Sequence, residues 1–228
     1  MITIPKEMEP KLRELMQVFL AENANINLSA FRTEQACWIG NILDSLSFIH
    51  TAHAVALKPG SKILDLGTGG GFPLLPLAIA LPEHQYSGMD ATQKKIAAVN
   101  RILKALNLSN VETIAGRSEE LGHEPAYREQ YDVVLSRGLA ELPTLLEYCA
   151  PFVKPYGKIV LWKSMTIDQE LKDSLLARAE LSCHLVDHYR YELPGDFGTR
   201  QLLVFEKAAP LSRKYPRGLG IPKKDPLM

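Results

Sequence analysis

Apolar positions in the first part of the chain recur at helical spacing. After Pro5 this spacing predicts an amphipathic helix through Met8, Leu12, Leu15, Met16, Phe19 and Leu20. A loop containing Asn23, Asn25 and Asn27 is expected to end it. A second helix is predicted from about residue 33 to residue 56, with Ile39, Ile42, Leu43, Leu46 and Ile49 on one face. Residues 1–57 are therefore interpreted as a helical cap that packs on the rest of the protein.

The pattern from residue 62 onward alternates between strand and helix. Strands are predicted at residues 62–66, 85–90, 111–115, 131–136 and 158–163, and helices at 72–80, 92–107, 141–150 and 167–179. This alternation predicts a mainly parallel sheet with helices on both faces. Extended runs at 181–193 and 201–207, joined by a Pro/Gly turn, predict an antiparallel last pair. Residues 58–208 thus indicate the α/β, Rossmann-like fold of class I methyltransferases.

The C-terminal tail, residues 209–228, has a different composition. It is rich in Pro, Gly and basic residues and lacks apolar periodicity, so it is not expected to fold by itself. From Leu211 onward five basic residues stand against Asp225, a net charge of +4, which leaves −4 on the rest of a chain that is neutral overall. Two interpretations are open: the tail contacts a polyanion, or it is a solubilising terminus.

The composition is that of one ordinary globular domain of 228 residues, with 46% hydrophobic and 23% charged residues. Pro73 and Pro76 interrupt the longest apolar stretch, which is far shorter than the roughly 20 residues that span a bilayer. The N-terminus shows no export signal, and three widely spaced cysteines predict reduced thiols. We expect a cytoplasmic monomer with no membrane partner.

Candidate chemistry begins at positions 65–72, Asp-Leu-Gly-Thr-Gly-Gly-Gly-Phe, between a predicted strand and a predicted helix. Clustered glycines let a backbone approach a ligand closely. Asp65 would repel the pyrophosphate of a dinucleotide, whereas a carboxylate suits a ligand with an amine and a sulfonium. S-Adenosylmethionine is such a ligand. We therefore predict that this cofactor is bound by Asp65, Gly67, Thr68, Gly69 and Gly71.

Polar residues follow the next two strands. Asp90 ends the second strand, where a carboxylate accepts the hydroxyls of a ribose; the alternative is a cap of the helix that follows. Ser118 and Glu119 come after the third strand, where class I enzymes hold the adenine edge; the alternative is the start of a surface helix, and this motif does not decide between them by itself.

Ser136 and Arg137 end the fourth strand, where a methyl acceptor would meet the cofactor. The chain has neither the Asn/Asp-Pro-Pro-aromatic turn of amine methylation nor a cysteine nucleophile at this point. An acceptor that is already nucleophilic, such as guanine N7, fits this absence because it needs no general base. Arg137 could contact a phosphate or guanine O6, or pair with a structural acid. Lys163 and Arg200 could add positive charge to the same cleft or be solvated strand ends.

No metal site is predicted. His50 and His53 lie three residues apart on a predicted helix, and Cys183, His184 and His188 cluster on a predicted strand. Neither group has further ligands at a suitable spacing.

Several motifs together resemble one known family. They are Asn-Leu-Ser at 27–29, Ile-Leu-Asp-Ser-Leu at 42–46, the glycine turn, Asp90, Arg-Ser-Glu-Glu at 117–120, Ser136-Arg137, Trp162-Lys163, Arg200 and the tail motifs at 213–217 and 220–227. On these residues the chain resembles the bacterial small-subunit ribosomal RNA guanine-N7 methyltransferases (RsmG, formerly GidB) over nearly its whole length. The resemblance implies N7 methylation of one guanosine in 16S ribosomal RNA, with 16S rRNA or the small ribosomal subunit as partner.

The resemblance also implies roles for individual residues. Gly67, Phe72, Ser118, Glu119 and Arg137 would bind the cofactor or lie beside it. Lys163 and Arg200 would lie toward the RNA, so the predicted catalytic residues are Arg137, Lys163 and Arg200.

The chain departs from the family pattern on the acceptor side. It has Asn41 where His is usual, Gly138 where Ala is usual and Ser164 where Gly is usual. Two alternatives therefore stay open: a methyltransferase of a small molecule or protein, and a ribosome-associated factor that binds S-adenosylmethionine with little turnover.

Overall fold

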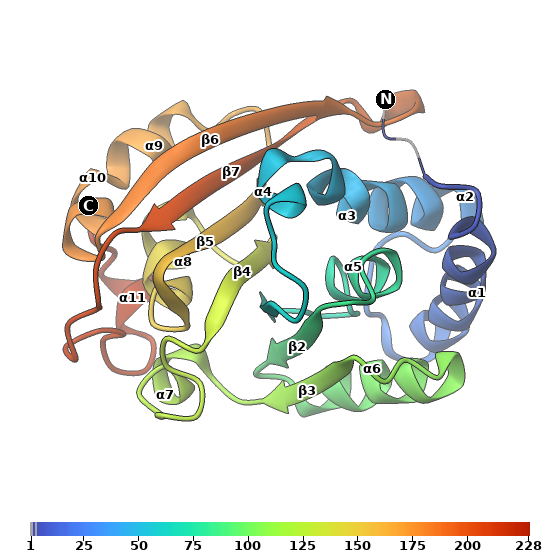
Figure 1. The fold of residues 1–228 in the computed structure, drawn as a ribbon, viewed down its shortest axis with the longest axis horizontal. Helices are drawn as coiled ribbons and strands as arrows, with labels where there is room; N and C mark the ends of the chain where they lie inside the picture. Colours follow the sequence, from blue (N-terminus) through green and yellow to red (C-terminus); the bar gives the residue numbers. More distant parts are fainter. Residues whose placement is uncertain (1, 3) are drawn as a thin grey trace.

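The computed structural model describes residue 2 and residues 4–228 of the protein. In this part of the chain one seven-stranded sheet runs in the order β3-β2-β1-β4-β5-β7-β6 (Figure 1). Its strands are β1 (Lys62–Leu66), β2 (Gln85–Asp90), β3 (Val111–Ala115), β4 (Tyr131–Arg137), β5 (Val153–Lys163), β6 (Cys183–Glu192) and β7 (Thr199–Lys207). Strands β1 to β5 pair in parallel, and β7 runs antiparallel to both β5 and β6. The predicted class I sheet, mainly parallel with an antiparallel last pair, is confirmed.

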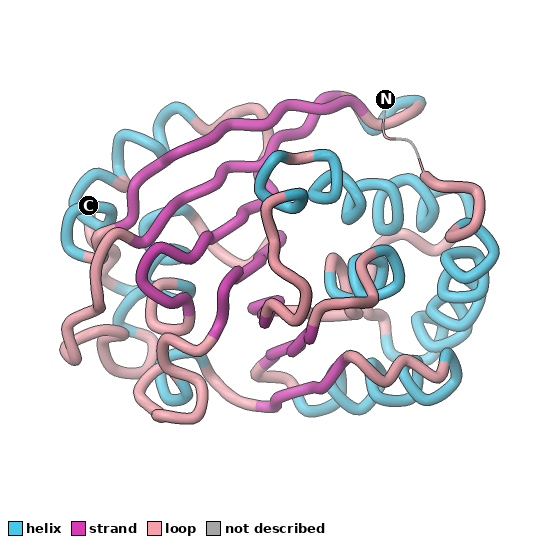
Figure 2. The backbone as a smooth tube through the Cα atoms, viewed as in Figure 1, coloured by secondary structure: helices cyan, strands magenta, loops and turns pink. Residues whose placement is uncertain are grey.

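Helices cover both faces of this sheet (Figure 2). One face carries α1 (Glu9–Ile26), α2 (Glu34–Cys37), the π-helical turn η1 (Trp38–Leu43), α3 (Asp44–Leu46), the 3-10 turn η2 (Ser47–His50), α4 (Ala52–Val55), α5 (Leu74–Ala80) and α6 (Gln93–Leu106). The other face carries α7 (Ser118–Leu121), α8 (Leu142–Cys149), α9 (Asp168–Asp173) and α10 (Leu175–Glu180). A short 3-10 turn, η3 (Gly195–Phe197), lies between β6 and β7.

Successive residues of the central strands feed two separate cores. In β1 the side chain of Ile63 packs with the N-terminal helices and α5, whereas that of Leu64 packs with α8, and both are fully buried. A parallel sheet that is covered on both faces requires such continuous apolar strands. The same arrangement leaves the carboxyl ends of the strands as the edge where polar residues can meet a ligand.

The predicted second helix, residues 33–56, is helical but not regular. It is divided among α2, η1, α3, η2 and α4, and Thr51 adopts an extended conformation with ψ 150°. The Thr51 hydroxyl then accepts a hydrogen bond from the Ala54 amide and begins α4. The π-helical turn coincides with Gly40, whose carbonyl faces the sheet and accepts a hydrogen bond from Arg137.

The predicted loop at Asn23 and Asn25 is wrong, because α1 continues through both residues and ends at Asn27 in the left-handed conformation. Asn23 is 2% exposed, and its amide exchanges hydrogen bonds with the backbone of Ser29. Asn23 is therefore part of α1, and its side chain fixes the backbone of Ser29, which follows the end of the helix.

Among the remaining elements, β5 and the predicted helix at residues 167–179 differ most from the prediction. Strand β5 begins at Val153, five residues earlier than expected, because its first part pairs with Tyr131 across an irregularity in the ladder. The predicted helix at residues 167–179 is split into α9 and α10 at the buried residue Ser174.

The tail is ordered by contacts with the rest of the protein. Arg128 donates hydrogen bonds to the carbonyls of Leu211, Ser212 and Tyr215. The tail includes one short helix, α11 (Ile221–Lys224), which lies against α8 (Figure 1). The tail therefore adopts its conformation by docking on the sheet's second face.

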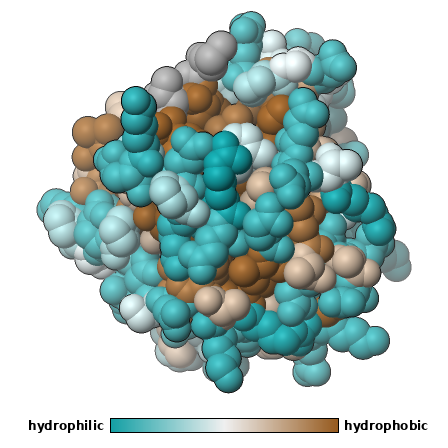
Figure 3. All heavy atoms as spheres, turned by 90° about the vertical axis from the view of Figure 1, so that its right-hand side faces the viewer, coloured by the Kyte–Doolittle hydropathy of each residue, from teal (hydrophilic) through white to brown (hydrophobic). Residues whose placement is uncertain are grey.

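The surface on the side of α1 and α6 is mainly hydrophilic, with smaller hydrophobic areas between the polar side chains (Figure 3). This agrees with an amphipathic α1 whose apolar residues, such as Leu12 and Phe19, are fully buried. Among the helices that the structure describes, none combines the length and apolarity of a membrane span.

Candidate active site

A large cavity opens at the carboxyl ends of β1 to β4. Its volume is about 680 Å³. Four predicted site residues line it, namely Gly67, Asp90, Ser118 and Glu119. Open parallel sheets bind their ligands at this edge, where the strand order reverses. Here the order reverses between β1 and β4, so the cavity lies at the expected point.

The glycines of the turn serve different purposes. Gly69 has φ +57°, and a Cβ on it would meet only the Gly67 carbonyl oxygen at 3.8 Å, so this position is open. At Gly71, with φ +90°, a Cβ would lie 2.5 Å from Cδ1 of Leu75 inside the protein. Gly71 is therefore required for packing α5 against the turn, and it does not line the cavity.

Asp65 lies beneath the turn. Its side chain is 1% exposed, and its Oδ2 accepts a hydrogen bond from the Leu74 amide at the start of α5, 3.3 Å away. Burial raises the pKa of this carboxyl to about 6. Its Oδ1 and the buried hydroxyl of Thr68 make no hydrogen bond of standard geometry among the described residues, but the nearby Thr68 side chain favours the charged carboxylate and so lowers the pKa of Asp65. A buried carboxylate with a free acceptor at this turn fits a cofactor that brings an ammonium group.

Asp90 connects the turn with the second strand. Its Oδ2 accepts a hydrogen bond from the Gly69 amide at 3.1 Å, and its Oδ1 accepts one from the Thr92 amide at 2.8 Å. Lys95 lies 3.9 Å from the same carboxylate. Asp90 thus supports the start of α6 and also lines the cavity, so both roles predicted for it are compatible with its position.

Ser118 and Glu119 form the first turn of α7 at the far end of the cavity. The Ser118 hydroxyl donates to Oε2 of Glu119, 3.1 Å away, and Oε1 of Glu119 accepts from the Gly220 amide of the tail at the same distance. Glu119 is only 6% exposed, whereas a residue at the start of a surface helix is expected to be exposed.

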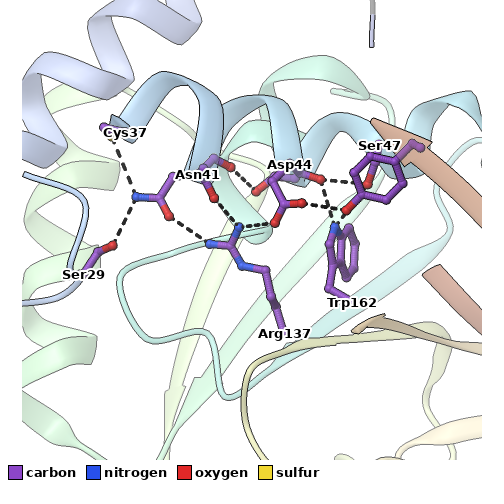
Figure 4. Close-up of polar contacts among 10 residues, drawn as sticks. Ser29, Cys37, Asn41, Asp44, Ser47, Arg137 and Trp162 are labelled. Atoms are coloured by element: carbon purple, nitrogen blue, oxygen red, sulfur yellow. Dashed lines mark hydrogen bonds and ion pairs between the residues drawn. The ribbon is translucent and has the colours of Figure 1, made fainter. Parts of the chain in front are cut away.

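Arg137 joins the sheet to the N-terminal helices (Figure 4). Its Nη1 donates to the Gly40 carbonyl at 2.9 Å and to Oδ2 of Asp44 at 2.8 Å, and its Nη2 donates to Oδ1 of Asn41 at 3.0 Å. The second oxygen of Asp44 accepts from the Tyr191 hydroxyl at 2.6 Å. Of the two roles considered for Arg137, pairing with a structural acid is the one present in the structure.

A smaller cleft of about 240 Å³ lies beside this network. Arg137, Asp44 and Asn41 line it together with Arg200, which opens β7. The rings of Phe31 and Phe197 also line it, with their centroids 5.6 Å apart.

Six predicted residues lie outside both cavities, namely Asp65, Thr68, Gly69, Gly71, Phe72 and Lys163. Lys163 is 11% exposed; its Nζ donates to Oε2 of Glu170 at 2.6 Å and to the Ala140 carbonyl, so it is neither a solvated strand end nor a free cation in the cleft. Phe72 is buried and packs edge to face against Phe19. Thr68 is buried within the turn.

Sequence reasoning missed several residues that line the cavities. Tyr148 of α8 and the tail residues Lys223 and Pro226 line the large cavity, and Phe31 and Phe197 line the small cleft. No local pattern marks them, because they come from segments distant in sequence. In the described part of the chain no group of three or more His, Cys, Asp or Glu side chains is placed to hold a metal ion.

The fold and the site together define a class I S-adenosylmethionine-dependent methyltransferase. Solved structures of the same fold include TrmN from Thermus thermophilus, with a TM-score of 0.55 at 20% identity over 72% of this chain and 48% of that one. A putative methyltransferase bound to the Haloferax volcanii Trm112 activator has a TM-score of 0.59 at 17% identity, over 84% of this chain and 98% of that one.

Sequence comparison narrows this class to one family. The family model for rRNA small subunit methyltransferase G (GidB) matches residues 8–191. Ribosomal RNA small subunit methyltransferase G of Carboxydothermus hydrogenoformans is 36% identical over 99% of this chain and 94% of that protein. The Deinococcus deserti protein of the same name is 38% identical over 90% of this chain and 83% of that protein. The chain belongs to the rRNA small subunit methyltransferase G family.

Proposed function

We propose that the protein transfers a methyl group from S-adenosylmethionine to N7 of one guanosine in 16S ribosomal RNA. The relatives are named as small-subunit ribosomal RNA methyltransferases, which supports the substrate class. The observation that carries the N7 assignment is that the described residues lining the small cleft include no unpaired carboxylate or imidazole that could act as a general base. Asp44 is the carboxylate that lines this cleft, and both of its oxygens are occupied, by Arg137 and by Tyr191.

Consecutive residues after β4 line the two cavities. Gly138 lines the small cleft, and the next residue, Leu139, lines the large cavity. A donor in the large cavity and an acceptor in the small cleft would therefore approach each other across this turn. Such positioning can supply a large part of the catalysis of a methyl transfer.

The large cavity has groups suited to the nucleoside part of the cofactor: Asp90 would accept the ribose hydroxyls, and Ser118 and Glu119 would hold the adenine edge. Asp65 and Thr68 do not line the cavity; they are buried beneath the glycine turn, from where the Asp65 carboxylate would favour the positively charged amino end. When bound, S-adenosylmethionine supplies a methyl group activated by a sulfonium.

The acceptor chemistry requires no proton transfer. The N7 lone pair would form the new N–C bond while the C–S bond breaks, and the sulfur would keep the electron pair. The product guanine carries the positive charge, which the ion pair between Arg137 and Asp44 tolerates better than a lone arginine would. Arg200 has no acidic partner among the described residues and is left to contact a phosphate.

Nucleophilic catalysis by cysteine does not fit the site. The three cysteines of the chain are all buried. Burial raises the pKa of the Cys37 thiol, which lies nearest in sequence to the small cleft, to about 11. A thiolate that could attack a pyrimidine ring would therefore be rare at neutral pH.

The substrate implies a cytoplasmic protein that acts on ribosomal RNA or on the small subunit, and we expect it to act as a monomer. Exposed basic residues of the tail, such as Arg213 and Lys224, are suited to contact phosphates.

The test is transfer of a labelled methyl group to naked 16S ribosomal RNA and to 30S particles, followed by nucleoside analysis. Label in 7-methylguanosine is the expected result. Label only in small molecules or proteins would refute the proposal. So would S-adenosylhomocysteine binding and RNA binding without transfer, which would indicate an association factor.

A further inference from the structure

The C-terminal tail contributes directly to the large cavity. Lys223 and Pro226 line it. The Gly220 amide donates to Glu119, and the Pro222 carbonyl accepts from the Thr144 hydroxyl at 2.9 Å. The tail therefore forms part of the cavity's wall.

One ion pair fixes this part of the tail. Glu147 of α8 is fully buried, and it accepts hydrogen bonds from the Arg217 amide at 2.8 Å and from Nε and Nη2 of the same residue. Nη2 of Arg217 also donates to the Asp225 carbonyl at 2.6 Å. Arg217 therefore closes the loop from residue 217 to residue 225 and holds it against α8.

A buried carboxylate is costly unless it is paired and hydrogen-bonded. In the described structure Arg217 supplies all the hydrogen bonds that Glu147 accepts. Detachment of the loop would leave this buried charge unpaired. The closed position of the loop is thus strongly favoured by a group that does not itself line the cavity.

The basic residues of the tail divide into two groups. The donors of Arg217 are occupied by the buried Glu147 and by the exposed Asp225, so Arg217 is not available for RNA. Arg213 and Lys224 are exposed. Lys214 is also exposed and pairs with Glu180 of α10, at a point of the tail that does not line the cavity.

We propose that residues 217–226 form the outer wall of the cofactor cavity beside Glu119, and that Arg217 and Glu147 are positioning residues that set the affinity for the cofactor. This rests on the assignment of the large cavity to S-adenosylmethionine. It predicts that bound ligand and tail stabilise each other, since a ligand that requires the wall stabilises the closed state by mass action.

The test uses the full-length protein and S-adenosylhomocysteine as the probe. Titration calorimetry should show that Arg217→Ala raises the Kd at least about tenfold, since the wall is released. Arg217→Lys, which keeps the charge, should recover part of the affinity. Lys214→Ala removes another ion pair of the same tail and is the matched control; its Kd should stay within about twofold of the wild type.

Hydrogen exchange can be measured on the wild-type protein, so this test does not depend on whether a variant folds. The Lys224 amide bonds to the Gly220 carbonyl and reports on the wall. At saturating ligand, exchange in residues 217–226 should slow at least about tenfold.

Unchanged exchange in this segment would overturn the proposal, even if Arg217→Ala fails to fold. A folded Arg217→Ala protein with a released tail and wild-type affinity would also overturn it. Failure of the wild type to bind the probe would instead refute the cofactor assignment, and the wall proposal with it.

Discussion

Replacement of Arg137 by methionine should separate its structural role from a direct role in cofactor binding. The substitution keeps much of the side-chain length but removes the donors to Gly40, Asn41 and Asp44. Asp44 is 7% exposed and would be left without a cation. Breaking a buried ion pair costs about 3–5 kcal/mol. Because Arg137 retains 20% of its side-chain exposure, we expect the lower end, about 3 kcal/mol.

For a protein of this size, a loss of that magnitude lowers Tm by roughly 6–12 °C. Urea unfolding of Arg137→Met, Asp44→Asn and the double variant would give the coupling free energy between the two residues, which we expect to be about 2 kcal/mol. Arg200→Met is the matched control, since Arg200 pairs with no acid in the described structure, and its cost should stay within about 0.5 kcal/mol.

The same variants distinguish the roles in function. Arg137 lines the small cleft and not the large cavity, so Arg137→Met should lose methyl transfer while its affinity for S-adenosylhomocysteine stays within about twofold. A coupling free energy near zero would refute the conclusion that this pair holds the N-terminal helices on the sheet. A large loss of cofactor affinity in a folded variant would show that Arg137 belongs to the cofactor site.

Three further predictions concern single residues. Asp90→Ala should weaken S-adenosylhomocysteine binding by roughly 10- to 100-fold in calorimetry, since hydrogen bonds to a charged group contribute about 1.5–3 kcal/mol; wild-type affinity would exclude a ribose contact. The pKa of Asp65 is raised from 3.8 to about 6, so the folded state binds the proton more tightly and stability falls as pH rises through that window, by about 3 kcal/mol in total. Asp65→Asn should therefore raise Tm at pH 7.5 but not at pH 3.5, while weakening cofactor binding; equal changes at both pH values would contradict the assigned burial. Arg200→Ala should raise the KM for the RNA substrate about tenfold, because one contact with a phosphate is lost, and should leave the affinity for S-adenosylhomocysteine unchanged. A change in the affinity for S-adenosylhomocysteine instead would place Arg200 in the cofactor site.

Much of the fold could be predicted because its signals are local. The bounds of β1, β2 and β3 agree with the apolar runs that predicted them, and the glycine turn lies between β1 and α5 as expected. Parallel strands joined by helices restrict the topology to few choices. The position of the cavity at the carboxyl edge follows from that topology, so the sequence is sufficient to assign Gly67, Asp90, Ser118 and Glu119 to one site.

Contacts between distant segments could not be predicted in this way. Arg137 and Asp44 lie 93 residues apart, and neither has a neighbour in sequence that indicates the other. Gly71 looked like a ligand-binding glycine, but its missing side chain makes room for Leu75. The sequence suggested that Lys163 is a solvated strand end, but its ammonium group forms an ion pair with Glu170 of α9.

The tail shows the division most clearly. Its composition determined that it would not form a domain of its own, because it has too few apolar residues to offset the entropy of ordering. Where it lies was decided by groups of the folded protein, among them Arg128 and Glu147, a buried carboxylate of α8 that pairs with Arg217, 70 residues later in the sequence. The sequence by itself determined the sheet, the glycine turn and the class of chemistry, since these depend on local periodicity and spacing. Only the tertiary structure decided which charged groups face a ligand and which are neutralised inside the protein, because that depends on partners that the chain brings together by folding.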